Sequence, residues 1–485
     1  MRTYFERLED IHYQPPSLEG HGKNGWLGTT LPNLNMIAAD LKILALVTSA
    51  ANALGAKLNS AITTVQQLMQ VLNPDINSDN PGRDYWETIY EHANSVTEAK
   101  RSGPRNFVIQ VANATNSDGS RKYHLDIRLN CLVTKVRFDA SSYGPPRAIG
   151  VDFLDGKSLY KADPRSNGST TGTPGSVNAT REVIISAGTY NTPQLLKLSG
   201  IGPYAELSAL GIPTLVNLSG VGNNLQDRYE VAVIGDTTSD FEIWNGCTFG
   251  NPPDPCFAEW QTGNGTDDGP YATNGLVLAL TKKSSSAARS DPVDLIIQAV
   301  PLPFKGYYPG YSNDAVSTKK RFSWVLLKGH TRDHAGTVNL RSADPSETPA
   351  ISFHYFDEGT TANNAANLDL EALVEGVQFA RSLFQSPILN GSFSETWPGP
   401  EVSSAEQIKQ WITDEAWGHH ACCTAPIGAD EDPMAVLDSR FRVRGTRGLR
   451  VVDASVFPKI PGLFMVVPIY TISEKAADVI LQDIF

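Results

Sequence analysis

The sequence predicts an α/β and α+β protein in which a nucleotide-type domain is interrupted by an inserted domain with an antiparallel sheet. Its length of 485 residues is enough for two or three domains. Helical and strand patterns first alternate up to about residue 229. A run of short strand patterns follows, and the chain then returns to a strand at 449–453 and a helix from about Ile469.

The inserted sheet is predicted from strand patterns without intervening long helices. These strands cover 275–281, 293–300, 322–329, 335–341 and 350–354. Apolar residues at helical spacing then predict helices over 368–385 and 404–416.

The first part of the chain predicts two helices over 34–72, broken near Gly55, and a short helix over 83–97. Strands are expected over 106–113, 122–138 and 148–154, followed by a mobile loop over 164–178. The apolar run 182–187 before Gly188 indicates a buried strand of a parallel sheet. A helix is expected to start at Asn191-Thr192-Pro193 and to end at Gly200.

The composition excludes several classes of partner. Apolar residues make up 41% of the chain and charged residues 19%, which suits a folded core. The net charge of −12 argues against nucleic acid or an anionic membrane surface as the main partner. The longest weakly polar run, 43–56, is too short to span a bilayer.

The cysteines predict no metal site. None of the five, Cys131, Cys247, Cys256, Cys422 and Cys423, has the CxxC spacing of a zinc site. Cys247 and Cys256 bracket a short loop and form either a disulfide or an ordinary pair of thiols. Cys422 and Cys423 are not expected to form a Cys–His dyad, because neighbouring residues on a strand point to opposite faces.

The compartment stays open. Six Asn-x-Ser/Thr sequons permit glycosylation in a secretory setting, at Asn113, Asn167, Asn178, Asn217, Asn264 and Asn390. The first residues are charged and lack the apolar stretch of a signal peptide.

Two consecutive histidines, His419 and His420, are the main candidates for chemistry. A histidine has an ordinary pKa of about 6.5, which suits proton transfer near neutral pH. The competing interpretation is a histidine pair with no chemical role. No Gly-x-Ser-x-Gly segment is present, so a hydrolase lacks an evident nucleophile.

Three other segments allow a functional and a structural interpretation. Residues 200–205 fit Gly-x-Gly-x-x-Ala, but they follow a helix and contain Pro203, so we interpret them as a helix stop. Asp453 ends a strand pattern and either contacts a ligand or caps the next turn. Residues 461–468 form either a buried loop or the lining of an apolar pocket.

Several motifs in the right order resemble the glucose–methanol–choline (GMC) oxidoreductases. They are 186–203 (SAGTYNTPQLLKLSGIGP), 221–227 (VGNNLQD), 448–458 (GLRVVDASVFP) and 474–478 (EKAAD), and the resemblance covers about 100–485. The resemblance implies FAD as cofactor, hydride transfer from an alcohol carbon to flavin N5, and His420 as the base, with His419 as support. It implies cofactor contacts at Val133, Ala187, Gly188, Asp453, Ala454, Val466 and Val467.

Two departures from the family pattern change these expectations. The strand–glycine-loop–helix that binds the FAD pyrophosphate is not found, so the FAD-binding domain is expected to be incomplete and Rossmann-like, N-terminally truncated relative to the family. The family's second His or Asn corresponds to Val466, which leaves His420 alone or helped by Tyr470 or His419. The domain boundaries are predicted at 1–235 and 439–485 for the FAD-binding part and 236–438 for the substrate-binding part.

The sequence therefore predicts an FAD-dependent oxidoreductase acting on CH–OH groups, with oxygen or another compound as electron acceptor. Trp417 and the apolar 463–467 segment favour a hydrophobic or aromatic alcohol. The alternative is a non-catalytic, truncated family member or binding protein that retains no flavin.

Overall fold

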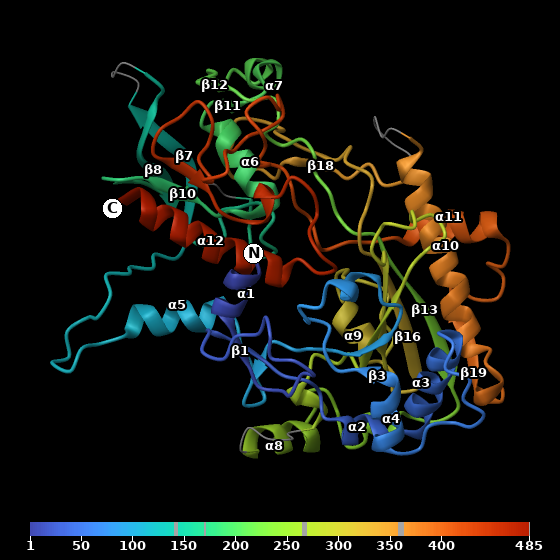
Figure 1. The fold of residues 1–485 in the computed structure, drawn as a ribbon. Helices are drawn as coiled ribbons and strands as arrows, with labels where there is room; N and C mark the ends of the chain where they lie inside the picture. Colours follow the sequence, from blue (N-terminus) through green and yellow to red (C-terminus); the bar gives the residue numbers. More distant parts are fainter. Residues whose placement is uncertain (140–143, 169–170, 264–268, 357–362, 485) are drawn as a thin grey trace. The chain divides into compact units, whose positions relative to one another are not determined.

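The computed structural model describes residues 1–139, 144–168, 171–263, 269–356 and 363–484 (Figure 1). It divides the chain into two compact units, each assembled from three stretches. Unit 1 comprises 1–110, 228–330 and 367–419, and unit 2 comprises 111–227, 331–366 and 420–485. The division by function at 235 and 438 stays a prediction, and the compact units follow other boundaries.

Unit 1 is built on a seven-stranded sheet, which contains three of the five strands predicted for the inserted antiparallel sheet, those over 275–281, 293–300 and 322–329. All neighbouring strands are antiparallel except the last two. β15 (Leu295–Val300) and β16 (Arg321–Lys328) are buried along nearly their whole length, which explains their largely apolar sequences. The strand order is β19 (Phe393–Trp397), β13 (Glu230–Thr237), β16 (Arg321–Lys328), β15 (Leu295–Val300), β14 (Leu278–Lys282), β4 (Ile89–Glu91) and β3 (Leu72–Asn73).

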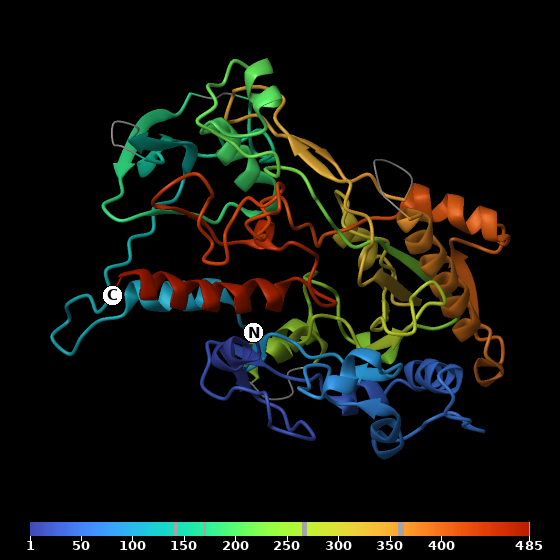
Figure 2. The ribbon, with the colours of Figure 1, turned by 45° about the horizontal axis from the view of Figure 1, so that its top comes forward.

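Helix α10 (Ala365–Phe384) packs along this sheet in unit 1, where the orange helix runs beside the green and yellow strands in Figure 2. A side chain at Gly376 would come within 2.6 Å of Leu326 on β16, so the helix approaches the sheet closely. The fully buried Lys328 is 3.3 Å from Asp294 and 3.5 Å from Asp369 of α10. Helix α11 (Ala405–Glu415) follows and starts with a capping box. Both predicted helices are confirmed.

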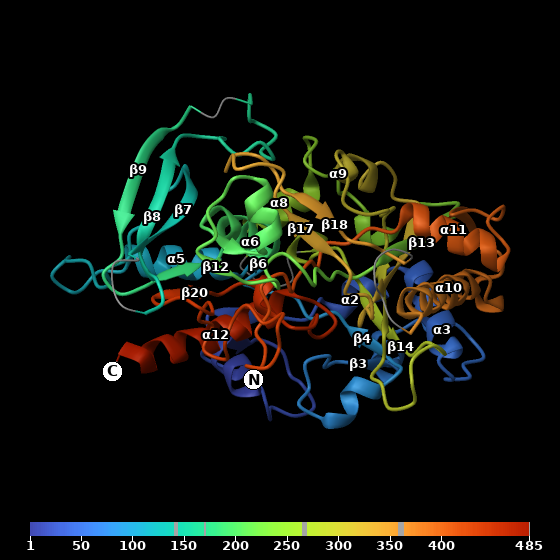
Figure 3. The same ribbon diagram turned by 90° about the horizontal axis from the view of Figure 1, so that it is seen from above.

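Among the described residues of unit 2, the main strand systems are a three-stranded sheet and a parallel pair, drawn with their helices in Figure 3. β7 (Cys131–Asp139), β8 (Arg147–Asp155) and β9 (Thr173–Asn178) form an antiparallel sheet. β10 (Val183–Ile185) and β20 (Leu449–Val451) form a parallel pair, as the sequence predicts for 182–187. Helices α6 (Gly188–Leu198) and α12 (Val466–Ile484) contribute apolar residues to the core of this unit.

The remaining elements connect these parts. They are α1 (Arg2–Leu8), β1 (Glu9–Ile11), β2 (Leu27–Thr29), α2 (Leu34–Ala38), α3 (Leu41–Ala53), α4 (Val65–Val71), η1 (Pro81–Tyr85), β5 (Val96–Thr97), β6 (Lys100–Arg101), α5 (Pro104–Asn113), β11 (Ile201–Gly202), α7 (Tyr204–Ala209), β12 (Val216–Asn217), η2 (Glu242–Trp244), α8 (Pro255–Thr262), η3 (Pro270–Ala272), α9 (Tyr311–Ala315), β17 (Thr337–Asn339), β18 (Ala350–Ser352), η4 (Pro387–Leu389) and η5 (Ala454–Val456).

Several local predictions are wrong because long-range pairing or a cap overrides the local pattern. The expected helix over 83–97 is replaced by η1, β4 and β5, and β4 pairs with β14. The expected strand over 106–113 is helix α5, whose first residue is Pro104. Residues 122–130 form no strand, and β9 occupies part of the expected loop 164–178, of which 169–170 lie outside the described residues.

Other predictions hold in part. α6 starts three residues before Asn191, and Pro193 therefore lies inside it. The expected strands over 335–341 and 350–354 exist as β17 and β18, but they form their own two-stranded sheet in unit 2. The expected loop 461–468 ends in the first turn of α12, and Ile184 of the expected buried strand is 44% exposed.

Within the described ranges, no helix is both long enough and apolar enough to cross a bilayer. The sequence predicts the same.

Burial of Glu91 on β4 gives unit 1 a pH-dependent stability. Burial raises the pKa of its carboxyl from 4.5 to about 7. The folded chain therefore binds this proton more tightly than the unfolded chain, and stability is lost as the pH rises from 4.5 to 7. Above pH 7, the free energy of unfolding of Glu91→Gln is expected to exceed that of the parent by as much as about 3 kcal/mol. At pH 4.5, the variant and the parent should be about equally stable.

Denaturant unfolding at pH 4.5, 6 and 8 measures this difference. The matched control is Glu98→Gln, since Glu98 is exposed. A Glu91→Gln advantage that is independent of pH would contradict the titration.

Candidate functional site

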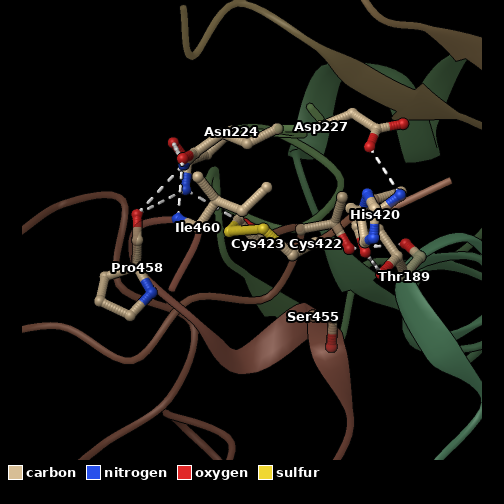
Figure 4. Close-up of a disulfide and its surroundings, with 12 residues drawn as sticks. Thr189, Asn224, Asp227, His420, Cys422, Cys423, Ser455, Pro458 and Ile460 are labelled. Carbon is tan, nitrogen blue, oxygen red and sulfur yellow. Dashed lines mark hydrogen bonds between the residues drawn. A yellow bond between two sulfur atoms is a disulfide. The ribbon is translucent and has the colours of Figure 1, made fainter. Parts of the chain in front are cut away.

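Residues 420–427 form the centre of the candidate site in unit 2 and are held along both edges (Figure 4). On one side, Cys422 and Gln226 exchange backbone hydrogen bonds of 2.9 and 3.2 Å. On the other side, the Cys423 and Ala425 amides donate to the carbonyls of Ala454 and Ser455, at 3.1 and 2.9 Å. This pairing fixes the backbone of the segment in the unit's core.

The same segment is tied to helix α6 through a proline. Pro193 has no amide hydrogen, so the carbonyl of Thr189 four residues earlier loses its helical donor. The hydroxyl of Thr424 donates to this carbonyl at 2.6 Å. The hydroxyl of Thr189 in turn donates to the carbonyl of Ala421 at 2.8 Å. The first turn of α6 thus positions the residues that directly follow His420.

His420 itself is 6% exposed. Its backbone amide donates to Oδ1 of Asp227 at 2.7 Å. The other oxygen of that buried carboxylate accepts from the hydroxyl of Tyr355 at 3.1 Å. The imidazole packs edge-on against Phe464, with ring centroids 5.7 Å apart. His420 is therefore a buried imidazole on a backbone that a carboxylate holds in place.

Removing the hydroxyl that replaces the missing helical donor is expected to weaken the site's frame. Thr424→Val keeps the shape of the side chain but leaves the buried Thr189 carbonyl without this donor. We expect a loss of about 1–3 kcal/mol in the stability of unit 2, measured by hydrogen exchange of the α6 amides. Thr424→Ser retains the donor and serves as control. Equal stability of the Val and Ser variants would show that this bond contributes nothing.

His419 belongs to unit 1 and has different neighbours. Its Nε2 is 3.2 Å from Oε1 of Glu230, a carboxylate that is almost fully buried. Its ring stacks on Tyr307 with centroids 4.7 Å apart and meets the edge of Trp417 at 5.3 Å. Burial raises the pKa of the Tyr307 hydroxyl, and the charge of Glu230 adds to this rise. The two consecutive histidines thus have separate environments.

The carboxyl ends of β10 and β20 meet beside α6, and the side chain of Asp453 joins them. Its Oδ2 accepts from the Gly188 amide at 2.9 Å and from the Thr192 hydroxyl at 2.6 Å. Its Oδ1 accepts from the amide and the hydroxyl of Ser455, at 2.8 and 2.5 Å. This remote cap at Gly188 explains why α6 starts earlier than its own sequence predicts.

The other candidate cofactor residues also lie in unit 2. Ala187 precedes α6 and is exposed, and Ala454 is buried in η5. Val133 lies on β7, a strand tied to α6 by the bond from the Val136 amide to the Ser199 hydroxyl at 2.9 Å. Val466 is 50% exposed at the start of α12, and Val467 follows it, half-buried. Among the candidate cofactor residues, Gly188 and Asp453 are joined directly by a hydrogen bond from the Gly188 amide to the Asp453 carboxylate.

Strand ends of this kind are where parallel sheets bind ligands. Gly188 has φ +82°, and a side chain there would meet nothing within 4 Å. Ile184 is 44% exposed, although strands of parallel sheets are normally covered on both faces. The residues present therefore fit a bound group at the strand ends.

Sequence reasoning missed two features of this site. Asp227 lies in the motif 221–227 but received no role, and only the fold brings it to His420. Cys422 and Cys423 form a disulfide between consecutive residues, which the alternation of side chains along a strand does not predict. The pairing of Cys247 with Cys256, left open by the sequence, is a disulfide.

Comparisons with known proteins agree with the motifs. Family models described as GMC oxidoreductase match residues 78–230 and 332–473. An Emericella nidulans protein named oxidoreductase cicC is 32% identical over 333 residues, covering 65% of this chain and 52% of its own length. An oxygen-dependent choline dehydrogenase from Brucella anthropi is 32% identical over 340 residues, covering 69% and 55%. The alignments thus span about half the length of these relatives.

Solved structures share the fold. A variant formate oxidase from Aspergillus oryzae RIB40 superposes with a TM-score of 0.76 at 22% identity, covering 99% of this chain and 78% of that one. A fungal aryl-alcohol oxidase superposes with a TM-score of 0.69 at 22% identity, covering 99% and 78%. These likenesses confirm the α/β fold class. With both family models in sequence order and the signature segments present, the chain belongs to the GMC oxidoreductase family.

Proposed function

We propose that the chain forms part of an FAD-dependent oxidoreductase that acts on CH–OH groups of donors, with His420 as general base. The observation that carries this proposal is the placement of His420 in unit 2. The imidazole is buried, its backbone is bound by Asp227, and its segment is hydrogen-bonded to the turn that follows β20. When bound, FAD would supply the acceptor for the hydride that leaves the alcohol carbon.

The task of His420 is to take the hydroxyl proton of the alcohol while the carbon is oxidised. A positioned base needs a fixed geometry, which the Asp227–His420 amide bond and the paired edges of 420–427 support. Phe464 covers part of the imidazole and helps to exclude water from it. Val466 cannot hydrogen-bond an alkoxide, so we assign the proton transfer to His420 without a partner at that position.

The proposed cofactor contacts follow the strand ends. All four hydrogen bonds of the Asp453 carboxylate that we describe are internal. Its role toward FAD would thus be to hold Gly188 and Ala454 in place, while a second anion at the carboxylate would be repelled. Residues Ala187, Gly188, Ala454, Val466 and Val467 would contact the cofactor directly, and Val133 would lie at its adenine end.

The proposed substrate is a small hydrophobic or aromatic alcohol, with oxygen or another compound as electron acceptor. Phe464, which packs against the imidazole of His420 within unit 2, supports this class, because an aromatic ring beside the base favours an apolar substrate. His419 is proposed as a supporting residue through its contact with Glu230.

The visible spectrum of the purified chain, before and after addition of FAD, tests the proposal. We expect flavin absorption bands that persist on gel filtration and that bleach anaerobically when a hydrophobic alcohol is added. A flavin-loaded protein that no member of an alcohol panel bleaches would reject alcohol oxidation. A chain that retains no flavin would favour the non-catalytic alternative.

A further inference from the structure

We propose that the Cys422–Cys423 disulfide is a redox-sensitive lock on the segment that carries His420. The inference rests on the proposed function of His420, and its structural part can be tested without turnover. Both cysteines are fully buried, and the first of them, Cys422, lies two residues after His420 (Figure 4). The disulfide lies within unit 2, between the 224–227 segment and the 454–460 segment.

The backbone at this disulfide is in an unfavourable conformation. Cys423 has φ +82°, a region that residues with a side chain rarely adopt. A covalent bond between neighbouring residues closes a small ring and limits the conformations open to both. The disulfide therefore helps to hold Cys423 in a conformation that a free cysteine would tend to leave.

This conformation orients the amide and the carbonyl of Cys423 toward the hydrogen-bond partners that hold the segment in place. The amide of Cys423 donates to Ala454 at 3.1 Å, and its carbonyl accepts from the side chain of Asn224 at 3.2 Å. Relaxation of Cys423 to negative φ would turn both groups away from these partners. The adjacent bonds, from Cys422 to Gln226 and from Thr189 to Ala421, would then lose support. Through them the change reaches His420.

The chemistry of the lock is thiol–disulfide exchange with a dithiol reductant. The reductant gives up two electrons and two protons and becomes a cyclic disulfide. The Cys422–Cys423 bond breaks, and each sulfur becomes a thiol. Because both sulfurs are buried, the exchange requires the segment to open transiently, so reduction should be slower than at an exposed disulfide.

The chain offers a matched control in its other disulfide, Cys247–Cys256, which lies in unit 1. We would incubate the full chain with dithiothreitol, alkylate the thiols and locate them by peptide mass. Hydrogen exchange of peptides covering 420–425 would be measured in parallel for the parent, Cys247→Ser/Cys256→Ser and Cys422→Ser/Cys423→Ser. Reoxidation of the reduced parent tests reversibility, and it remains available if the second variant does not fold.

Reduction is expected to speed amide exchange across 420–425 by about tenfold, reversibly, in the parent and in the Cys247→Ser/Cys256→Ser variant. Cys422→Ser/Cys423→Ser should exchange fast with or without dithiothreitol. In FAD-loaded protein, reduction should lower kcat in the same two chains. Unchanged exchange after reduction, or resistance of Cys422–Cys423 to dithiothreitol, would overturn the lock. A chain that oxidises no alcohol would reject the proposed function and leave the exchange result standing.

Discussion

Replacement of His420 by alanine is expected to lower kcat for alcohol oxidation by about 10²–10⁴-fold in FAD-loaded protein, the range that a positioned general base contributes. The variant retains the backbone amide that donates to Asp227, so the fold and the bound flavin should be unaffected. Anaerobic stopped-flow measurement of flavin bleaching reports the step directly. Exogenous imidazole should restore part of the rate, because it can occupy the space that the side chain vacates.

His419→Ala is the matched control for this prediction. His419 lies in unit 1 on Tyr307 and Glu230, so its removal should affect kcat much less than the loss of His420. Full turnover by His420→Ala would reject its assignment as the base. An equal loss in both histidine variants would indicate that both contribute to the chemistry.

Asp453→Ala is expected to destabilise unit 2 by about 3–5 kcal/mol. The substitution removes four hydrogen bonds that join the start of α6 to η5. A typical hydrogen bond contributes about 1 kcal/mol, and bonds to a charged group contribute more. Hydrogen exchange of the α6 amides measures the loss within this unit, which a single global unfolding curve for a chain with two compact units need not do.

Asp453→Asn is the control, because it keeps an oxygen acceptor on one side of the side chain and removes the charge. We expect the α6 amides of this variant to exchange faster than those of the parent and more slowly than those of Asp453→Ala. If the α6 amides exchange as slowly in the alanine variant as in the parent, the carboxylate has no structural role. Its proposed task of holding Gly188 would then be wrong.

Much of the fold follows from local sequence patterns. The apolar run 182–187 predicts the parallel strand β10, and the periodicity of 368–385 predicts α10. The strand patterns between 275 and 329 predict three neighbouring strands of the unit 1 sheet. These predictions hold because the side-chain period and the apolar content of one segment decide its type when no distant contact opposes them.

Other segments were decided by partners far away in the sequence. Residues 89–91 look helical locally and become a strand because β14 pairs with them. α6 starts at Gly188 because the carboxylate of Asp453, 265 residues away, accepts from its amide. Propensity describes one segment, whereas pairing and capping depend on what the fold brings to it.

The candidate site shows the same division. The sequence by itself determined the family, the residue types and His420 as the candidate base, because the motifs are contiguous in the chain. Only the tertiary structure decided that Asp227 accepts a hydrogen bond from the amide of His420, 193 residues away in the sequence. It also decided that the hydroxyl of Thr424 donates to the carbonyl of Thr189, 235 residues away. It also assigned His419 and His420 to different units. These outcomes depend on directional contacts between distant segments, and no local pattern contains that information.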